Sequence, residues 1–208
     1  RASPRPSPKG EAAGTSINPN AMEKVISFLK RLHPVSGSLE AALRNSFRFT
    51  RKKKNEFLVF EGEICRYAWY LQKGLVRSYY NQYEREVTTW FREEDHVIVL
   101  FKSLFGQKKS LFNIQALENC ELYAIHYQEI EALYTKYPEA MNLGNIVAER
   151  YSNLKDVKIR ATSMLTPEER YRYFEKHFPH LLNRVKLEYI ASYLDLSRRS
   201  LARARGLY

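Results

Sequence analysis

Residues 186–208 read KLEYIASYLDLSRRSLARARGLY, a pattern typical of two short helices joined by a tight turn. In the first helix, Ile190 and Leu194 place apolar side chains on one face. A turn follows at Asp195, and Ser197 is suited to cap the start of the second helix. The stretch therefore predicts a helix-turn-helix.

The second helix of the pair is strongly basic. Four arginines and no acid follow the cap, namely Arg198, Arg199, Arg203 and Arg205. In a DNA-binding helix-turn-helix, the second helix enters the major groove and presents side chains to the base edges. Arginine suits this position because its planar fork can donate two hydrogen bonds to guanine or clamp a phosphate. The pattern predicts binding to double-stranded DNA; the alternative is a helical hairpin that closes a domain, with solvated arginines.

Composition supports a polyanionic partner. The 208 residues fit one large or two small domains, and 44% hydrophobic residues are enough for a core. The formal net charge of +11 favours nucleic acid first and an anionic membrane surface second. Residues 166–208 contain nine Lys or Arg and five Asp or Glu, so the helix-turn-helix region also carries a net positive charge.

The two cysteines, Cys65 and Cys120, have no Cys or His close to them in sequence. Structural zinc and iron–sulfur sites need about four ligands, so no metal or other cofactor is predicted. Two reduced thiols in a cytoplasmic protein are expected rather than a disulfide. No run approaches the ~18 apolar residues of a membrane span and no signal peptide is visible, so no membrane partner is expected.

The N-terminal part divides into a leader and two helices. Residues 1–21 are rich in Pro, Ser, Gly and Ala, which predicts a disordered leader, either a vector remnant or an upstream extension. From Met22 the apolar residues follow helical spacing until His33-Pro34 breaks the pattern. A second short helix is predicted around residues 38–43.

Between about Phe47 and His126 the sequence changes to short aromatic and β-branched runs at near-regular spacing. Such a pattern predicts an antiparallel β-sandwich or barrel. An apolar run over Val97–Phe105 predicts one short helix inside this region. The predicted strands are FLVF (57–60), YAWYLQ (67–72), LVRSYYN (75–81), VTTWFR (87–92), SLFNIQAL (110–117) and ELYAIH (121–126).

Helices are predicted again after the β region. One spans Tyr127–Tyr134, and a longer one opens at Pro138 and reaches about Leu165. Its apolar positions approximate a 3.5-residue repeat, which is compatible with a homodimeric coiled-coil seam. Packing of the helix on its own β domain is an equal alternative. The repeat comprises Val147, Tyr151, Leu154, Val157 or Lys158, Ala161 and Leu165.

Thr166-Pro167-Glu168-Glu169 is a strong helix start, with an N-cap, a proline at the first position and a glutamate at the third. It predicts a domain boundary and a helix that runs to about His177.

In this order of elements, the chain from Met22 onward resembles the CRP/FNR family of bacterial transcription regulators, in the variant common in Bacteroidetes. The motifs that carry the resemblance are EFLVFEGEICRYAWYLQKGLVRSYY (56–80), SLFNIQALENCELYAI (110–125) and LEYIASYLDLSRRSLARAR (187–205). The resemblance implies an α+β chain in three parts. These are an N-terminal double-stranded β-helix or jelly-roll domain like that of cyclic-nucleotide binders (22–136), a connecting and dimerising helix (137–165), and a winged-helix-like helix-turn-helix domain (166–208).

Site residues follow from the same resemblance. Arg198, Arg199 and Arg203 match the recognition-helix positions that contact base edges in relatives, and Arg205 matches a phosphate contact. Ser197 matches the helix N-cap, whose neighbouring amides meet phosphate. Two departures stand out: Asp195 replaces the turn glycine of many relatives, and the residues after the recognition helix predict a short or absent wing.

The expected effector pocket departs further from the family. Cyclic-nucleotide binders hold the ribose with a Gly-Glu pair and the phosphate with an Arg-Ser pair, whereas this chain has Ile98-Val99 and Lys109-Ser110. A ribose without its carboxylate loses hydrogen bonds of ~1.5–3 kcal/mol each, so cAMP binding in the usual way is not expected.

Two interpretations of the β-domain interior remain open. Lys108, Lys109 and Ser110 could hold a different anionic small-molecule effector. Alternatively, no ligand binds and apolar side chains such as Val99 and Phe112 fill the space, with Lys108-Lys109 as a solvated turn.

Other function classes find little support. The five histidines have no metal-binding spacing, and neither a nucleophile elbow nor a phosphate-binding glycine loop is present, so no enzyme is predicted. The competing interpretation is a small-molecule-sensing or protein-interaction module whose helix-turn-helix has lost DNA binding.

Overall fold

Two helices begin the folded part of the chain. In the computed structural model, which describes residues 19–163 and 166–206, α1 spans Pro19–Leu32 and α2 spans Gly37–Ser46. Ser36 caps α2 by accepting a hydrogen bond from the Leu39 amide at 3.2 Å. The predicted C-terminal boundary of the leader, residue 21, is wrong, because residues 19–21 already belong to α1. Proline suits the first turn of a helix, because an N–H at that position has no partner within the helix. Residues 1–18 lie outside the described residues.

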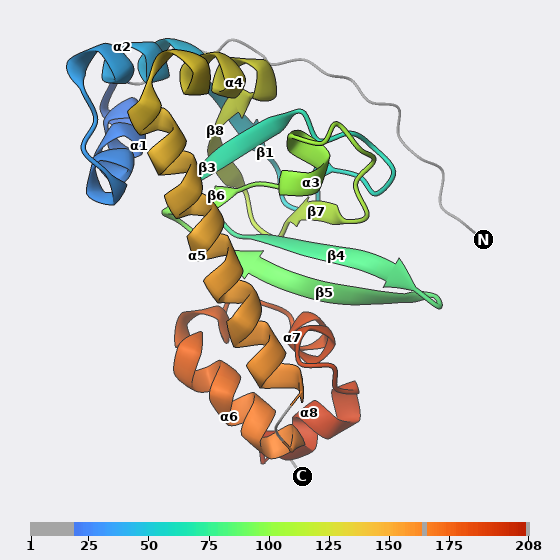
Figure 1. The fold of residues 1–208 in the computed structure, drawn as a ribbon. Coiled ribbons are helices and arrows are strands. Elements are labelled where there is room, and N and C mark those ends of the chain that lie inside the picture. The colour runs from blue at the N-terminus through green and yellow to red at the C-terminus, as the bar shows by residue number, and fades with distance from the viewer. Residues whose placement is uncertain (1–18, 164–165, 207–208) are drawn as a thin grey trace.

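The β domain is an antiparallel sandwich of two four-stranded sheets (Figure 1). One sheet has the strand order β1-β8-β3-β6 and the other β2-β7-β4-β5. Each sheet therefore combines strands from both ends of the region, as double-sheet jelly rolls do. This confirms the predicted α+β fold class. The strands are β1 Arg48–Lys52, β2 Phe57–Val59, β3 Tyr67–Lys73, β4 Val76–Gln82, β5 Arg85–Arg92, β6 His96–Ile98, β7 Asn113–Ala116 and β8 Cys120–His126.

The six predicted strands correspond to β2, β3, β4, β5, β7 and β8, while β1 and β6 were not predicted as strands. The predicted short helix is α3, Phe101–Leu104, which follows β6 directly. The two cysteines are free and buried, Cys65 just before β3 and Cys120 at the start of β8.

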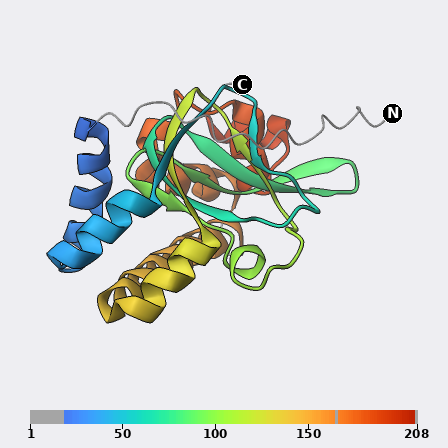
Figure 2. The same cartoon turned by 90° about the horizontal axis from the view of Figure 1, so that it is seen from above.

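Two helices then leave the β domain. Helix α4 spans Tyr127–Lys136, and α5 spans Pro138–Ser163. Figure 1 shows that α5 runs past the sandwich to the C-terminal helices, and Figure 2 shows α1 and α2 beside it on one flank of the strands. On α5, Val147 and Tyr151 pack against the core of the same β domain. These two positions of the predicted seam therefore follow the alternative interpretation, in which the helix packs on its own domain; Leu165 lies outside the described residues.

The C-terminal part is a small helical domain. It comprises α6 Pro167–His177, η1 Pro179–Leu181, α7 Leu187–Tyr193 and α8 Arg198–Ala204. The predicted start of α6 is confirmed: Thr166 and Glu169 form a reciprocal capping box, and Pro167 opens the helix. Within the described part of the chain, no helix is both long and apolar enough to cross a membrane.

Candidate nucleic-acid interface

The α7–turn–α8 unit is built as the sequence predicts. Ile190 of α7, Leu194 at the C-cap of α7 and Leu201 of α8 are buried together in the helical domain. Asp195 adopts a left-handed backbone with φ of 53°, which Asp tolerates better than most residues. Ser197 caps α8 by accepting a hydrogen bond from the Ser200 amide at 3.0 Å. This packing fixes which face of α8 meets solvent.

The exposed face of α8 is cationic. Arg198, Arg199 and Arg203 are exposed, while Leu201 between them is buried. Arg198 has one loose ion pair, 3.9 Å from Glu188. The structure therefore leaves all three of the predicted base-contacting arginines exposed on α8. Arg205 differs, because it is half-buried.

Arg205 lies at the C-terminal end of α8, and its guanidinium stands 5.9 Å from the ring centroid of Tyr171. This contact ties its side chain to α6, so it has less freedom than the other three arginines.

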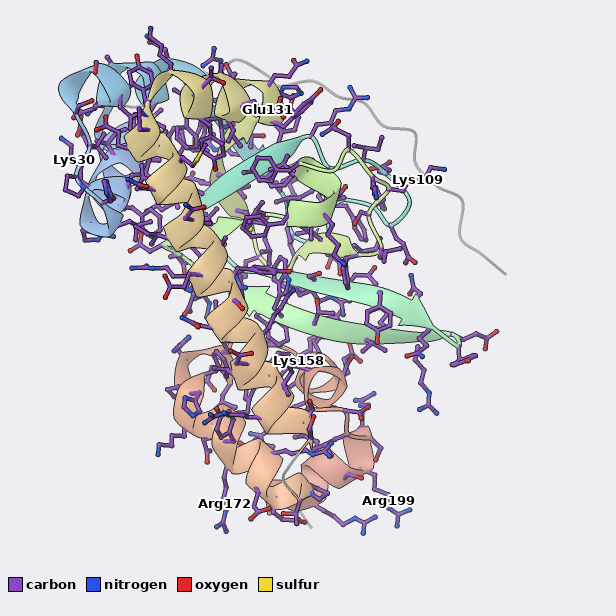
Figure 3. The ribbon with its side chains drawn as sticks, viewed as in Figure 1. Lys30, Lys109, Glu131, Lys158, Arg172 and Arg199 are labelled. Carbon is purple, nitrogen blue, oxygen red and sulfur yellow. The ribbon has the colours of Figure 1, made fainter. Side chains whose placement is uncertain are left out.

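Helix α6 adds basic residues that the sequence analysis did not single out. Arg172 is exposed on α6, on the side opposite the buried Tyr171 and Phe174. Figure 3 shows Arg172 and Arg199 both pointing out from the same end of the molecule. The amphipathic pattern of α6 could have identified Arg172 as exposed, but only the fold places it at the same end as Arg199.

The helical domain is docked on strand β5, an edge strand of its sheet. The Ser192 hydroxyl on α7 accepts a hydrogen bond from the Thr88 amide at 2.8 Å and donates one to the Glu86 carbonyl at 2.5 Å. Lys158 at the end of α5 donates to the Thr88 carbonyl. Side chains thus satisfy backbone groups that an edge strand would otherwise leave open.

A cluster of charges closes the same domain boundary. Arg184, just before α7, donates to Glu118 at 2.8 and 2.9 Å and to Glu94 at 2.9 and 3.0 Å. The hydrogen bonds that Arg184 donates to Glu118 and Glu94 raise its pKa. Burial alone would raise the pKa of Glu94, but hydrogen bonds from Arg184 and from the backbone hold it below its ordinary value.

A second arginine of the boundary is fully buried. The guanidinium of Arg77 lies 4.2 Å from the Tyr79 ring and 3.6 Å from the ring of Tyr189 on α7. It also pairs with Glu86 at 2.5 Å and with Gln115. This arginine therefore belongs to the packing between the domains and not to the exposed basic face of α8.

The predicted effector residues are dispersed. The Ser110 hydroxyl is buried and its one donor is engaged locally, because it donates to the Phe112 carbonyl at 2.7 Å; it also accepts from the Phe112 amide at 3.0 Å. Lys109 lines a polar cavity of about 560 Å³, in Figure 3 on the flank away from α1. Val99 lines a different cavity of about 350 Å³ beside α5, and Lys108 is exposed.

Aromatic side chains join the short helix α3 to its neighbours. Phe101 packs edge-on against Tyr151 of α5 with ring centroids 5.4 Å apart, and Phe105 stacks on Tyr134 of α4 at 6.2 Å. The region that carries the expected Gly-Glu and Arg-Ser positions is therefore held against the helices by the chain's own rings.

Comparison with known proteins agrees with this architecture. Residues 49–137 match the family model of the cyclic nucleotide-binding domain. The β domain has the cyclic nucleotide-binding fold. A comparison with curated proteins finds no match.

Solved structures extend the likeness beyond the β domain. FixK2 from Bradyrhizobium japonicum superposes with a TM-score of 0.67 at 17% identity, over 77% of this chain and 83% of that one. The c-di-GMP-responsive regulator CLP from Xanthomonas campestris gives 0.65 at 14% identity, over 83% and 91%. A protein described as a Crp/Fnr-family transcriptional regulator from Eubacterium rectale gives 0.65 at 15%, over 85% and 87%. At these identities the likeness is one of fold.

The described residues form no candidate metal site. Across residues 19–163 and 166–206, no three His, Cys, Asp or Glu side chains lie together as metal ligands would.

Proposed function

We propose that this chain is a sequence-specific DNA-binding transcription regulator of the CRP/FNR type, in its Bacteroidetes-like variant. The observation that carries the proposal is the orientation of α8. Its apolar residue Leu201 is buried, its N-terminus is capped by Ser197, and its arginines face solvent. A recognition helix needs this orientation in order to enter a major groove.

The proposed roles follow from position. Arg198, Arg199 and Arg203 contact base edges, because they are exposed on α8 and have long, forked side chains. Backbone amides beside Ser197 contact a phosphate at the helix start. Arg205 contacts the backbone of DNA, with Tyr171 holding its guanidinium in place.

The regulator acts as a homodimer that reads two half-sites about one helical turn apart. Because Val147 and Tyr151 are engaged with the β domain, the seam on α5 uses another face. Met141 and Ile159 are 50% and 57% exposed. They are about five whole helical turns apart, so they lie on the same side of α5. Sedimentation of Ile159→Lys should then show a shift from dimer towards monomer.

The β domain does not bind cAMP in the usual way. Ile98 and Val99 are buried where a ribose-binding Gly-Glu pair would stand, and the Ser110 hydroxyl already donates its proton to the Phe112 carbonyl instead of to a phosphate. Calorimetric titration with cAMP should therefore show no binding in the micromolar range.

Fluorescence anisotropy with labelled duplex DNA tests the proposal. Arg199→Ala should weaken binding to a selected site by ~1–3 kcal/mol and relax the base preference, with unchanged thermal stability because Arg199 is exposed. Arg51→Ala is the matched control, since Arg51 is 67% exposed on β1, where it pairs with Glu121 and lies over the Phe49 ring, far from α8 in sequence.

The second candidate function is a sensing or protein-interaction module with a non-functional helix-turn-helix. It is favoured if Arg199→Ala and Arg51→Ala change DNA affinity equally, or if Arg199→Ala lowers stability and leaves DNA affinity unchanged.

A further inference from the structure

Strand β5 ends on a buried arginine that lacks an acidic partner. Arg92 is 6% exposed, and its Nη1 donates to the Phe91 carbonyl at 2.8 Å. No carboxylate of the described residues lies within ion-pairing distance of its guanidinium. Burial lowers the pKa of Arg92 to about 10. Buried charges in proteins are normally paired, so this guanidinium calls for an explanation.

Aromatic neighbours account for only part of its environment. The guanidinium carbon lies 4.8 Å from the Trp90 ring centroid and 5.7 Å from that of Tyr151. A cation–π contact is weaker than the cost of removing a full charge from water. Among residues 19–163 and 166–206, the Phe91 carbonyl accepts from Nη1, which leaves Nε and Nη2 for another acceptor.

Those nitrogens belong to a residue that lines a cavity of about 350 Å³ between β5, β6 and α5. This volume is within the range of small-molecule sites. His96, Arg150 and Asn153 supply further polar groups, and Val97, Val99 and Leu154 contribute apolar walls. Asp95 also borders the cavity, but its carboxylate already accepts from the Tyr70 hydroxyl and lies 3.9 Å from Arg31.

We propose that this cavity binds a small carboxylate or phosphate with a short apolar body, with Arg92 as its charge partner. Arg150 adds positive charge and hydrogen-bond donors at the rim, and His96 adds a polar ring. The site uses residues of β5, β6 and α5, whereas Lys109 and Ser110 take no part in it.

The cavity adjoins the boundary with the helical domain. Phe91, the neighbour of Arg92, packs its ring 5.5 Å from Tyr193 of α7. Arg92 and Tyr193 also line one smaller cavity of about 40 Å³. An anion bound at Arg92 would therefore lie next to Phe91, whose ring packs against α7 of the helical domain.

Calorimetric titration of the full chain tests the site with hexanoate and phenyl phosphate, and with hexanamide as an uncharged control. The wild-type protein should bind at least one of the two anions saturably and hexanamide not at all. Arg92→Met should weaken that binding at least tenfold. Lys109→Met, which removes a positive charge from the other cavity, should leave it unchanged.

Thermal unfolding separates a ligand site from a structural role. Because Met fills a similar volume without a buried charge, Arg92→Met should melt at or above the wild-type temperature. The proposal is overturned if neither anion binds saturably or if Arg92→Met binds it equally well. It is also overturned if Arg92→Met only changes dimerisation, which would assign the guanidinium to a carboxylate of a second copy. None of these readouts depends on DNA binding.

Discussion

The turn into α8 rests on two residues with different tasks. Asp195 adopts a left-handed backbone conformation, and the Ser197 hydroxyl oxygen accepts a hydrogen bond from the Ser200 amide in the first turn of α8. Ser197→Ala removes that acceptor, so we expect unfolding free energy to fall by ~1 kcal/mol. Urea denaturation measures this, with the exposed Ser152→Ala on α5 as control. Equal stability of the two variants would mean that water replaces the cap at no cost.

Lys158 gives the domain boundary a pH dependence. Burial lowers its pKa to about 8, with Asp195 opposing the shift. The unfolded chain then holds more protons than the folded one between the two pKa values, so stability should rise with pH from about 8 to 10.5. Lys158→Met removes this titration while keeping the length of the side chain.

The measurement is urea denaturation of both proteins at pH 7.5 and pH 10. Relative to Lys158→Met, the wild type should gain about 1–2 kcal/mol at the higher pH. A difference that stays constant across this range would show that the ammonium is not desolvated.

At the scale of elements, β5 depends on the helices that cover its edge. Ser192 bridges the Glu86 carbonyl and the Thr88 amide, so Ser192→Ala leaves both backbone groups without that partner. We expect a loss of ~1–3 kcal/mol in stability and faster hydrogen exchange at Thr88. Thr89, the next residue of β5, is the internal reference, because its hydroxyl donates a hydrogen bond to the Ser78 carbonyl inside the sheet. Unchanged exchange at Thr88 would contradict this account of the edge.

Most elements could be predicted from local pattern, and the exceptions have physical reasons. Strand β1 has the sequence RFTRK, whose three basic residues give no apolar strand pattern. It forms a strand because it pairs with β8, which is distant in the chain. On α5 the repeat leaves two interpretations open, a dimer seam or packing on its own β domain, because a repeat shows which residues share a face but not which surface covers it. The structure shows that Val147 and Tyr151 pack on the β domain.

The candidate site divides in the same way. The cap at Ser197 and the exposed arginines of α8 follow from spacing within one helix, which sequence displays directly. Arg184 could not be singled out, because Glu94 and Glu118 are distant from it in the chain. Arg92 could not be singled out either, because the residues of α5 that line its cavity are distant from it in the chain. Long-range neighbours of this kind need the fold.

At the scale of the whole molecule, Arg184 ties the helical domain to the sandwich. It bonds Glu94 and Glu118, which lie in two different loops of the β domain. Arg184→Ala leaves those carboxylates without their cation, and we expect looser docking at a cost of about 2–3 kcal/mol. Hydrogen exchange should rise on both α7 and β5. Arg51→Ala, an exposed pair on β1, should change neither element.

The account of Arg184 would be contradicted if exchange rose within the helical domain alone, since that would mean Arg184 stabilises its own domain and not the boundary.

The central claim is that α8 reads DNA sequence in a two-fold symmetric complex. Selection from a random pool of duplex DNA by the purified chain, at physiological salt and without added ligand, tests it most directly. We predict enrichment of a palindromic site whose half-sites lie about one helical turn apart, and loss of that enrichment in Arg199→Ala. Weak, salt-sensitive binding with no enriched sequence in either protein would contradict the claim.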